Sequence, residues 1–314
     1  MYKFILTIDS ACDYDLVELK RENIPVIFYK YSCDDKFYDD DMLESSYKSF
    51  YKKMRGGKVF KTSQINPQEY YDFFEEQYKL YNLPIIHISL GSGVSNTINS
   101  ANIAISMLKD EYSDIDVRVI DSKLASAGLA ILLFEGIKYR NEYKNIDETY
   151  DHIMELVPNL NTYYTTNTLT YFAKGGRLSK VEAFIGNALK INPILDCSPS
   201  GALRVVEKQR GSEKAYRRII ERIKATVINP EKQTVIVCDA DNKELGQKMA
   251  NRLKKEVGFK DYKLTSMGPI IGAHTGPDLI AIFYLGKPRN EQTKLVETKE
   301  KVHLEIDRKI KKYS

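Results

Sequence analysis

Short hydrophobic runs alternate with longer amphipathic stretches through the first half of the chain. The runs at residues 4–8, 84–90 and 117–120 are each followed by small polar or acidic residues, and their length predicts buried strands. Between them lie stretches with helical spacing, such as PQEYYDFFEEQYKLY from Pro67, in which the proline occupies the first turn. Strands that alternate with helices across short connections are typical of a parallel α/β sheet.

The second half of the chain changes in character near Tyr163, where threonine and tyrosine become frequent. It contains two predicted amphipathic helices, SEKAYRRIIERIKATV and KELGQKMANRLKKEV, and four predicted strands, LKINPIL, LRVVEK, QTVIVC and DLIAIFYL. We therefore expect an α/β fold of two domains, residues 1–165 and 166–287, followed by a helical tail over 288–314. A cleft between two domains is the usual place for a ligand.

Composition narrows the class of protein only modestly. The 314 residues carry a net charge of +4 from 47 basic and 43 acidic residues, which is too even a balance to predict binding to nucleic acid. No run of 18 apolar residues predicts a membrane span, so any membrane contact is expected to be peripheral. Four scattered cysteines and four scattered histidines predict no metal site and a reduced, cytoplasmic protein.

Three predicted strands end in similar pairs of residues, namely Asp9-Ser10, Gly91-Ser92 and Asp121-Ser122. The carboxyl ends of parallel strands meet at one edge of a sheet, where ligands of α/β proteins bind. One such pair is typical of a helix cap. Three pairs together predict a polar floor for a ligand cleft.

The loop over residues 91–96, GSGVSN, allows three interpretations. A dinucleotide-binding loop is the first, because a strand precedes it, a helix follows it and Asp121 could meet a ribose hydroxyl; however, Asn96 replaces the usual third glycine. A serine hydrolase is the second, with Ser92 or Ser95 as the nucleophile and a histidine from the second half as the base. The usual G-x-S-x-G pattern of such a nucleophile is missing.

The third interpretation is an anion cradle. A helix that starts near Ser95 would point its free backbone amides at an anion, and the serine hydroxyl would add a donor. A second glycine-rich stretch, predicted as a loop over 268–277, would place the imidazole of His274 opposite. Neither loop contains lysine or arginine, so their neutral donors suit one carboxylate better than a polyphosphate.

Seven motifs along the chain resemble those of the DegV family. They are FILTIDSACD, KTSQINP, SLGSGVSNTINSA, VIDSKLASAGLA, YFAKGGRLS, LKINPIL and GPIIGAHTGP, which span residues 1 to about 287 in the family's order. Each motif alone is a weak signal, whereas seven in order are specific. The resemblance implies a two-domain α/β fold, with a parallel-sheet amino-terminal domain, a second α/β domain and an apolar ligand tunnel at and below the cleft between them.

The same resemblance implies a function. Proteins of the DegV family bind one long-chain fatty acid and present its carboxylate to a bacterial fatty acid kinase, which forms an acyl phosphate for phospholipid synthesis. By this likeness the protein is a lipid-binding carrier and not itself an enzyme, and it needs no cofactor besides its bound fatty acid. A serine hydrolase of acyl esters and a nucleotide-dependent oxidoreductase are the alternatives.

Residues that match the family's motifs supply the expected site. The resemblance assigns carboxylate binding to Thr62, Ser95 and His274, with secondary roles for Ser63, Ser92 and Gly93. It assigns contact with the kinase to Arg177 and Arg204. The chain departs from the family pattern at Ile65 and Asn96, where the family often has proline and glycine.

Three other stretches carry further expectations. The acidic stretch DDKFYDDD, residues 34–41, is predicted as a solvated loop. LASAGLAILLF and AFIGNALKI are candidate walls of the tunnel, although such sequences are also typical of an ordinary core.

Overall fold

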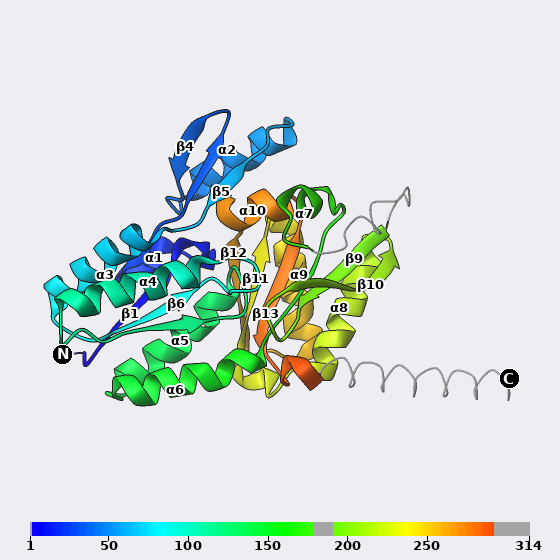
Figure 1. The fold of residues 1–314 in the computed structure, drawn as a ribbon. Helices are drawn as coiled ribbons and strands as arrows, with labels where there is room; N and C mark the ends of the chain where they lie inside the picture. The colour runs from blue at the N-terminus through cyan, green and yellow to red at the C-terminus, as the bar shows by residue number, and fades with distance from the viewer. Residues whose placement is uncertain (1, 179–190, 292–314) are drawn as a thin grey trace, which may run out of the picture.

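Four parallel strands form the first sheet, in the order β2–β1–β6–β7 (Figure 1). The computed structural model describes residues 2–178 and 191–291 of the chain. The strands are β1 (Ile5–Asp9), β2 (Val26–Ile27), β6 (Ile85–Ser89) and β7 (Val117–Asp121). β1 and β6 are buried along their whole length, as expected for strands of a parallel sheet that is covered on both faces. The three strands predicted in this half are confirmed.

Helices cover both faces of the first sheet. In Figure 1, α3 and α4 lie on one face, and α5 and α6 lie on the opposite face. A capping box between Asn66 and Glu69 starts α3, with Pro67 in the first turn as predicted. The helices are α1 (Leu16–Arg21), α3 (Pro67–Tyr81), α4 (Thr97–Glu111), α5 (Gly128–Asn141) and α6 (Ile146–Leu156), and the short 3-10 turns are η1 (Ser10–Cys12) and η2 (Val157–Asn159).

The second sheet is mixed, with the strand order β10–β9–β8–β13–β11–β12. Only β11 and β12 run parallel to each other. The strands are β8 (Leu160–Thr165), β9 (Ile191–Cys197), β10 (Leu203–Arg210), β11 (Thr234–Asp239), β12 (Asp261–Ser266) and β13 (Ile280–Leu285). The four strands predicted in this half are confirmed. The polar sequence DYKLTS of β12 lacks the hydrophobic run that identified the others.

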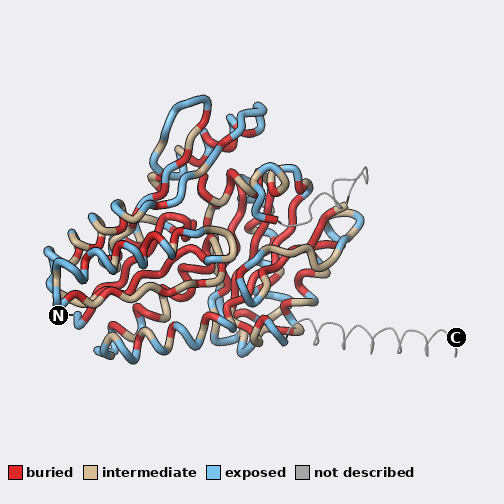
Figure 2. Tube along the Cα trace, viewed as in Figure 1, coloured by how far each residue is buried: buried red, intermediate tan, exposed pale blue. Residues whose placement is uncertain are grey.

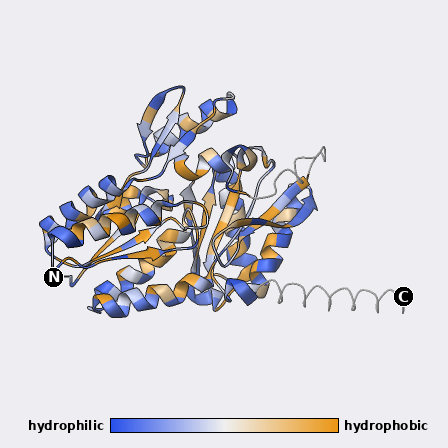
Figure 3. Cartoon of the chain, viewed as in Figure 1, coloured by the Kyte–Doolittle hydropathy of each residue, from blue (hydrophilic) through white to orange (hydrophobic). Residues whose placement is uncertain are grey.

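Each face of the second sheet belongs to a different core. The helices α8 (Ser212–Thr226) and α9 (Lys243–Val257), which begin where predicted, pack on one face, and the 3-10 turn η4 (Pro230–Lys232) lies between α8 and β11. In β13, Ile282 packs in the core beneath these helices, whereas Phe283 packs in the core shared with the first sheet. Figure 3 shows hydrophobic central strands surrounded by helices of mixed hydropathy.

Strand β8 precedes the domain boundary predicted at 165, yet it pairs with β9 and β13 inside the second sheet. The division into domains therefore stays a prediction. The predicted tail falls on residues 292–314, and the stretch AFIGNALKI falls mostly on residues 179–190; both lie outside the described residues. Among the described helices, none is both long enough and apolar enough to cross a bilayer.

A small antiparallel sheet stands out from the rest of the molecule at the top of Figure 1. It consists of β3 (Lys30–Cys33), β4 (Lys36–Asp39) and β5 (Lys61–Ser63), and the helix α2 (Glu44–Arg55) accompanies it; we call this the Lys30–Ser63 unit. Figure 2 shows that much of the unit is exposed. Its core is aromatic, with Tyr31 in contact with Phe50 and Phe60.

The prediction of a solvated loop over residues 34–41 is correct for the exposure of most of the stretch but wrong for its backbone, because Lys36–Asp39 form the strand β4. Asp34 and Asp35 form the exposed turn between β3 and β4, in the left-handed backbone conformation that aspartate tolerates. Asp40, in contrast, is only 1% exposed. The sequence KFYD of β4 has neither a hydrophobic run nor a polar–apolar alternation, so local pattern did not identify this edge strand.

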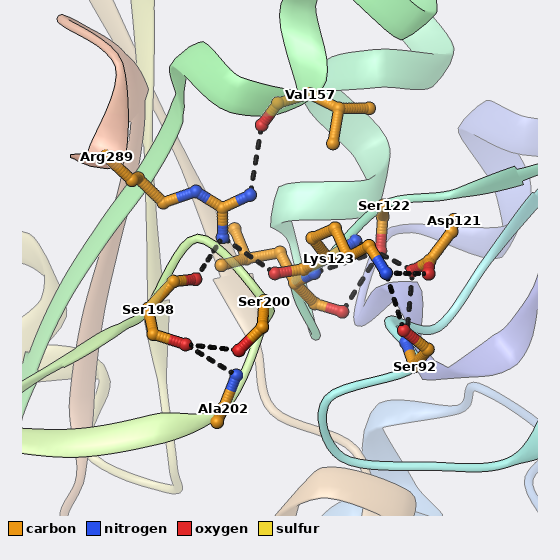
Figure 4. Close-up of polar contacts among 10 residues, drawn as sticks. Ser92, Asp121, Ser122, Lys123, Val157, Ser198, Ser200, Ala202 and Arg289 are labelled. Atoms are coloured by element: carbon orange, nitrogen blue, oxygen red, sulfur yellow. Dashed lines mark hydrogen bonds and ion pairs between the residues drawn. The ribbon is translucent and has the colours of Figure 1, made fainter.

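The buried side chain of Arg289 connects the parts of the molecule just before the described residues end (Figure 4). Its guanidinium donates hydrogen bonds to the backbone oxygens of Lys123 at 2.7 Å, Ser198 at 3.2 Å and Val157 at 3.0 Å. Lys123 follows the first sheet, and Ser198 follows β9 of the second. One side chain therefore bridges loops of both sheets, in addition to the core that the sheets share.

We expect Arg289→Met to lower the free energy of unfolding by roughly 2–4 kcal/mol, because three hydrogen bonds from a charged, buried donor are lost. Chemical denaturation of the two proteins measures the difference. Arg210→Met is the matched control, since Arg210 is exposed. Equal losses in the two variants would contradict the role of Arg289 as a connection between the sheets.

Candidate functional site

A cavity of about 580 Å³ lies between the two sheets and the Lys30–Ser63 unit. Its walls are mostly apolar and come from elements far apart in the sequence; they include Leu90, Val94, Leu124, Phe172, Ile270, Leu279 and Phe283. Polar side chains also line the cavity, and they include Thr62, Ser63, Gln64, Ser95, Arg177 and His274. A long apolar space of this size with a few convergent polar groups is typical of a binding site for a small, mainly apolar molecule.

The central polar contact joins residues 212 positions apart in the sequence. Thr62, on β5, and His274, on α10 (Pro269–Thr275), are hydrogen-bonded at 2.7 Å between Oγ1 and Nε2. Burial, and secondly the nearby positive charge of Arg177, lowers the pKa of His274 to about 4. At neutral pH the imidazole is therefore uncharged.

The helix α7 (Thr170–Gly175) packs against the other edge of the imidazole. A Cβ atom on Gly175 would lie 2.6 Å from Nδ1 of His274, so only glycine leaves room for the ring. The left-handed backbone of Gly176 then ends the helix, and Arg177 donates a hydrogen bond to the oxygen of Gly175 at 2.7 Å. The GGR motif thus places a guanidinium next to a neutral histidine.

Ser95 lies at the start of α4, as predicted. Its hydroxyl accepts a hydrogen bond from the backbone amide of Thr97 at 3.3 Å, and the residue lines the cavity. The loop that carries it folds back through a bond from the amide of Ser95 to the oxygen of Gly91. Tyr29, which is buried, also lines the cavity. No local pattern marks this tyrosine as part of a site.

Two of the secondary candidates do not line the cavity. The hydroxyl of Ser92 accepts a hydrogen bond from Lys123 at 2.8 Å, and its amide donates to Asp121 at 3.0 Å (Figure 4). Gly93 packs against the backbone of Gly201, where a Cβ atom would come within 2.1 Å. These two residues shape the loop behind the cavity wall.

The two arginine candidates differ in their surroundings. Arg177 is exposed and lines the cavity. Arg204 is half-buried outside the cavity lining and forms a two-pronged ion pair with Asp196, with Nε–Oδ1 and Nη2–Oδ2 distances of 2.5 and 2.9 Å. This pairing raises the pKa of Arg204 and occupies its guanidinium.

The polar ends of the first-sheet strands meet at one edge but do not line the cavity. Asp9 accepts from the amide of Leu90 at 2.7 Å, and Asp121 accepts from the amides of Ser92 and Lys123. These carboxylates fix the loops whose next residues form the cavity wall. The predicted polar floor is therefore a support for the site.

The described residues provide neither the geometry of a serine hydrolase nor that of a dinucleotide-binding site. His274 has Thr62 at Nε2, and Nδ1 has no side-chain partner within the described ranges, so no carboxylate orients the ring for a serine nucleophile. Asp121 is engaged by the loop itself and by Lys123, which removes the free carboxylate that a ribose would require. Within residues 2–178 and 191–291, no cluster of His, Cys, Asp or Glu is placed to hold a metal ion.

The prediction of a loop over 268–277 is wrong, because most of this stretch forms α10. Three glycines and two prolines in GPIIGAHTGP suggested a loop. Pro269 instead occupies the first turn of the helix, and the glycines at 268 and 276 flank it. His274 consequently projects from a packed helix.

Known proteins of one family are similar to this chain in sequence and in fold. The profile of a family described as uncharacterised protein, DegV family, matches residues 3–287. A DegV domain-containing protein of Clostridium perfringens is 31% identical over 287 residues, which cover 91% of this chain and 98% of the relative. One from Streptococcus pyogenes serotype M3 is 29% identical over 287 residues, 90% of this chain and 98% of the relative.

Three solved structures share the architecture. A DegV lipid-binding protein from Thermotoga maritima has a TM-score of 0.81 at 27% identity, over 91% of this chain and 99% of its own. Another Thermotoga maritima protein, whose structure revealed a fatty acid binding function, has a TM-score of 0.78 at 26% identity, over 90% and 99%. DegV of Bacillus subtilis, a fatty acid binding protein, has a TM-score of 0.77 at 25% identity, over 91% and 100%. The predicted resemblance is confirmed.

We expect Gly175→Ala to displace His274, because the new methyl group would lie 2.6 Å from Nδ1. The pKa of the imidazole should then rise from about 4 toward its usual value near 6.5 as water reaches the ring. An NMR titration of the His274 ring measures the change. Gly56→Ala is the control, since its Cβ would meet nothing closer than 3.3 Å, and an unchanged titration in Gly175→Ala would contradict the packing argument.

Proposed function

The chain belongs to the DegV family, and from that premise we propose that it binds one long-chain fatty acid and presents the carboxylate to a fatty acid kinase. The observation that carries the proposal is the cavity itself, in which apolar walls lead to neutral hydrogen-bond donors. Related proteins of similar fold are described as binding lipid or fatty acid. By this proposal the protein is a carrier, and the chemistry belongs to the kinase.

The acyl chain supplies most of the binding free energy. Fourteen methylene groups at ~0.8 kcal/mol each contribute on the order of 11 kcal/mol when fully buried. Loss of translational and rotational freedom on association removes several kcal/mol of this. The remainder still favours a ligand that stays bound through purification.

The carboxylate would be held by Thr62, Ser95 and His274, with Ser63 beside them. Burying a carboxylate is costly unless hydrogen bonds replace its water. With His274 neutral at pH 7, its Nε2–H can donate to Oγ1 of Thr62 and leave the threonine hydroxyl hydrogen for the carboxylate, so no full positive charge is needed inside the cavity. A carboxylate oxygen held in this way stays nucleophilic, as attack on the terminal phosphate of ATP requires.

Arg177 is the residue best placed to meet the kinase. It is exposed, lies beside His274 and lines the cavity. Arg204 could serve a partner only after leaving Asp196, so we give it the lesser part. The expected cytoplasmic location agrees with a kinase that uses ATP.

The first test is mass spectrometry of the purified protein, in the native state and after solvent extraction. We expect one fatty acid of 14 to 18 carbons in near one-to-one ratio. A protein that is empty and also fails to take up added fatty acid would overturn the proposal.

Thr62→Val should weaken fatty acid binding roughly 10- to 100-fold, because a hydrogen bond to a charged group contributes about 1.5–3 kcal/mol. Ser95→Ala should act in the same direction. Titration with a fluorescent fatty acid measures the dissociation constants. Ser92→Ala is the matched control, since this hydroxyl is held by Lys123 outside the cavity, and it should change binding less than two-fold.

Arg177→Gln should lower acyl phosphate formation at least ten-fold while changing the dissociation constant of the fatty acid less than three-fold. The reason is that Arg177 lies at the surface, where a partner can reach it. The assay combines the loaded protein, a bacterial fatty acid kinase and ATP. Unchanged acyl phosphate formation by the variant would exclude Arg177 from the encounter.

A further inference from the structure

Glycine recurs at every fourth position along α10 and its two caps, and each glycine faces a tyrosine ring. A Cβ atom built on any of them would come within 2.6 Å of that tyrosine. The pairs are Gly268 with Tyr47, Gly272 with Tyr51, and Gly276 with Tyr171. Gly268 and Gly272 both face tyrosines of α2, so the backbone of α10 forms the contact surface with that helix, whereas Gly276 after the helix faces Tyr171 of α7.

Two of these tyrosines come from the same face of α2. Tyr47 and Tyr51 are four residues apart, and both are buried. The hydroxyl of Tyr51 donates a hydrogen bond to the backbone oxygen of Met267 at 3.0 Å, immediately before α10. The α2–α10 interface is therefore formed by tyrosine side chains on one helix and glycine backbone on the other.

The α2–α10 interface lies between the elements that carry Thr62 and His274. Thr62 lies on β5 and pairs with Tyr31 of β3. Tyr31 packs against Phe50, which neighbours Tyr51 on α2. On the other side of the interface, His274 lies two residues beyond Gly272 on α10. The packing of α2 against α10 therefore acts together with the direct contacts of α10 with β3 and β5 on the separation of Thr62 from His274.

We propose that Tyr51 is a positioning residue, whose seat on Gly272 sets the distance between Thr62 and His274 and so shapes the carboxylate end of the cavity. The role of that end rests on the proposed function. A hydrogen bond tolerates little displacement: the 2.7 Å contact between Oγ1 and Nε2 would be lost if α2 moved outward by about 1 Å. Tyr51 acts through this spacing and does not line the cavity.

The geometry at Gly272 allows a test by compensation. A methyl group on residue 272 would lie 2.5 Å from the hydroxyl oxygen of Tyr51, 3.1 Å from its Cζ and 3.0 Å from Cε1 of Phe50. Gly272→Ala therefore forces α2 away from α10. Tyr51→Phe removes the atom in closest conflict and leaves contacts of 3.0 and 3.1 Å, so the double variant should regain most of the native spacing.

Binding is measured with two test ligands, hexadecanoic acid and hexadecan-1-ol, which differ only in the polar group at the end of the chain. Gly272→Ala should weaken binding of the acid at least ten-fold and binding of the alcohol less than three-fold. Adding Tyr51→Phe should bring binding of the acid back to about the level of Tyr51→Phe alone. Tyr51→Phe alone should weaken the acid two- to five-fold, because the bond to Met267 is lost.

NMR titration of His274 gives a second readout that needs no ligand. The pKa of the imidazole should rise in Gly272→Ala and return toward about 4 in the double variant. Tyr143→Phe, at an exposed position, is the control and should match the wild type in both measurements. Circular dichroism establishes whether each variant is folded. If Gly272→Ala does not fold, the double variant and Tyr51→Phe still test whether residues 51 and 272 together set the position of His274.

The outcomes separate the two proposals. Equal weakening of acid and alcohol, or no recovery in the double variant, would overturn the positioning role of Tyr51. If the wild type binds neither ligand, the proposed function fails, whereas the His274 titration still supports or overturns the control of spacing by Tyr51.

Discussion

The hydrogen bond between Thr62 and His274 is the interaction on which the arrangement of the site depends. It joins the Lys30–Ser63 unit to a helix of the second half, and the first sheet supplies Ser95 beside them. Each part brings only one or two polar side chains, which are too few to replace the water around the carboxylate of the proposed ligand. The site therefore exists only when the three parts are packed together.

Buried carboxyl groups support that packing. Asp9 and Asp13 accept backbone amides at 2.7 and 2.8 Å, those of Leu90 in the cavity wall and of Gly268 at the start of α10. Burial raises the pKa of Asp9 to about 7 and that of Asp13 well above its usual value. Since the folded-state pKa is raised, the stabilisation from protonated Asp9 is complete below pH ~4 and is lost as the pH rises through about 7.

Much of the fold and part of the site could be predicted from local sequence. Hydrophobic runs identified the central strands, and the motifs around Thr62, Ser95 and His274 indicated residues that line one cavity. Local patterns did not identify β12 or Asp40, whose burial depends on neighbours from elsewhere in the chain. Ser92 and Ser95 share one loop and one chemistry, and only packing separates the hydroxyl held by Lys123 from the one in the cavity.

The sequence by itself determined the α/β class, the family and the set of candidate donors, because periodicity and the order of motifs can be read directly along the chain. Tertiary structure decided which donors converge, that GPIIGAHTGP is a helix, and that His274 is neutral. The physical reason is that helix propensity counts glycine as a breaker, whereas packing against tyrosine rings makes the missing Cβ an advantage. Likewise, a pKa follows from burial and neighbouring charge, which arise only when distant segments meet.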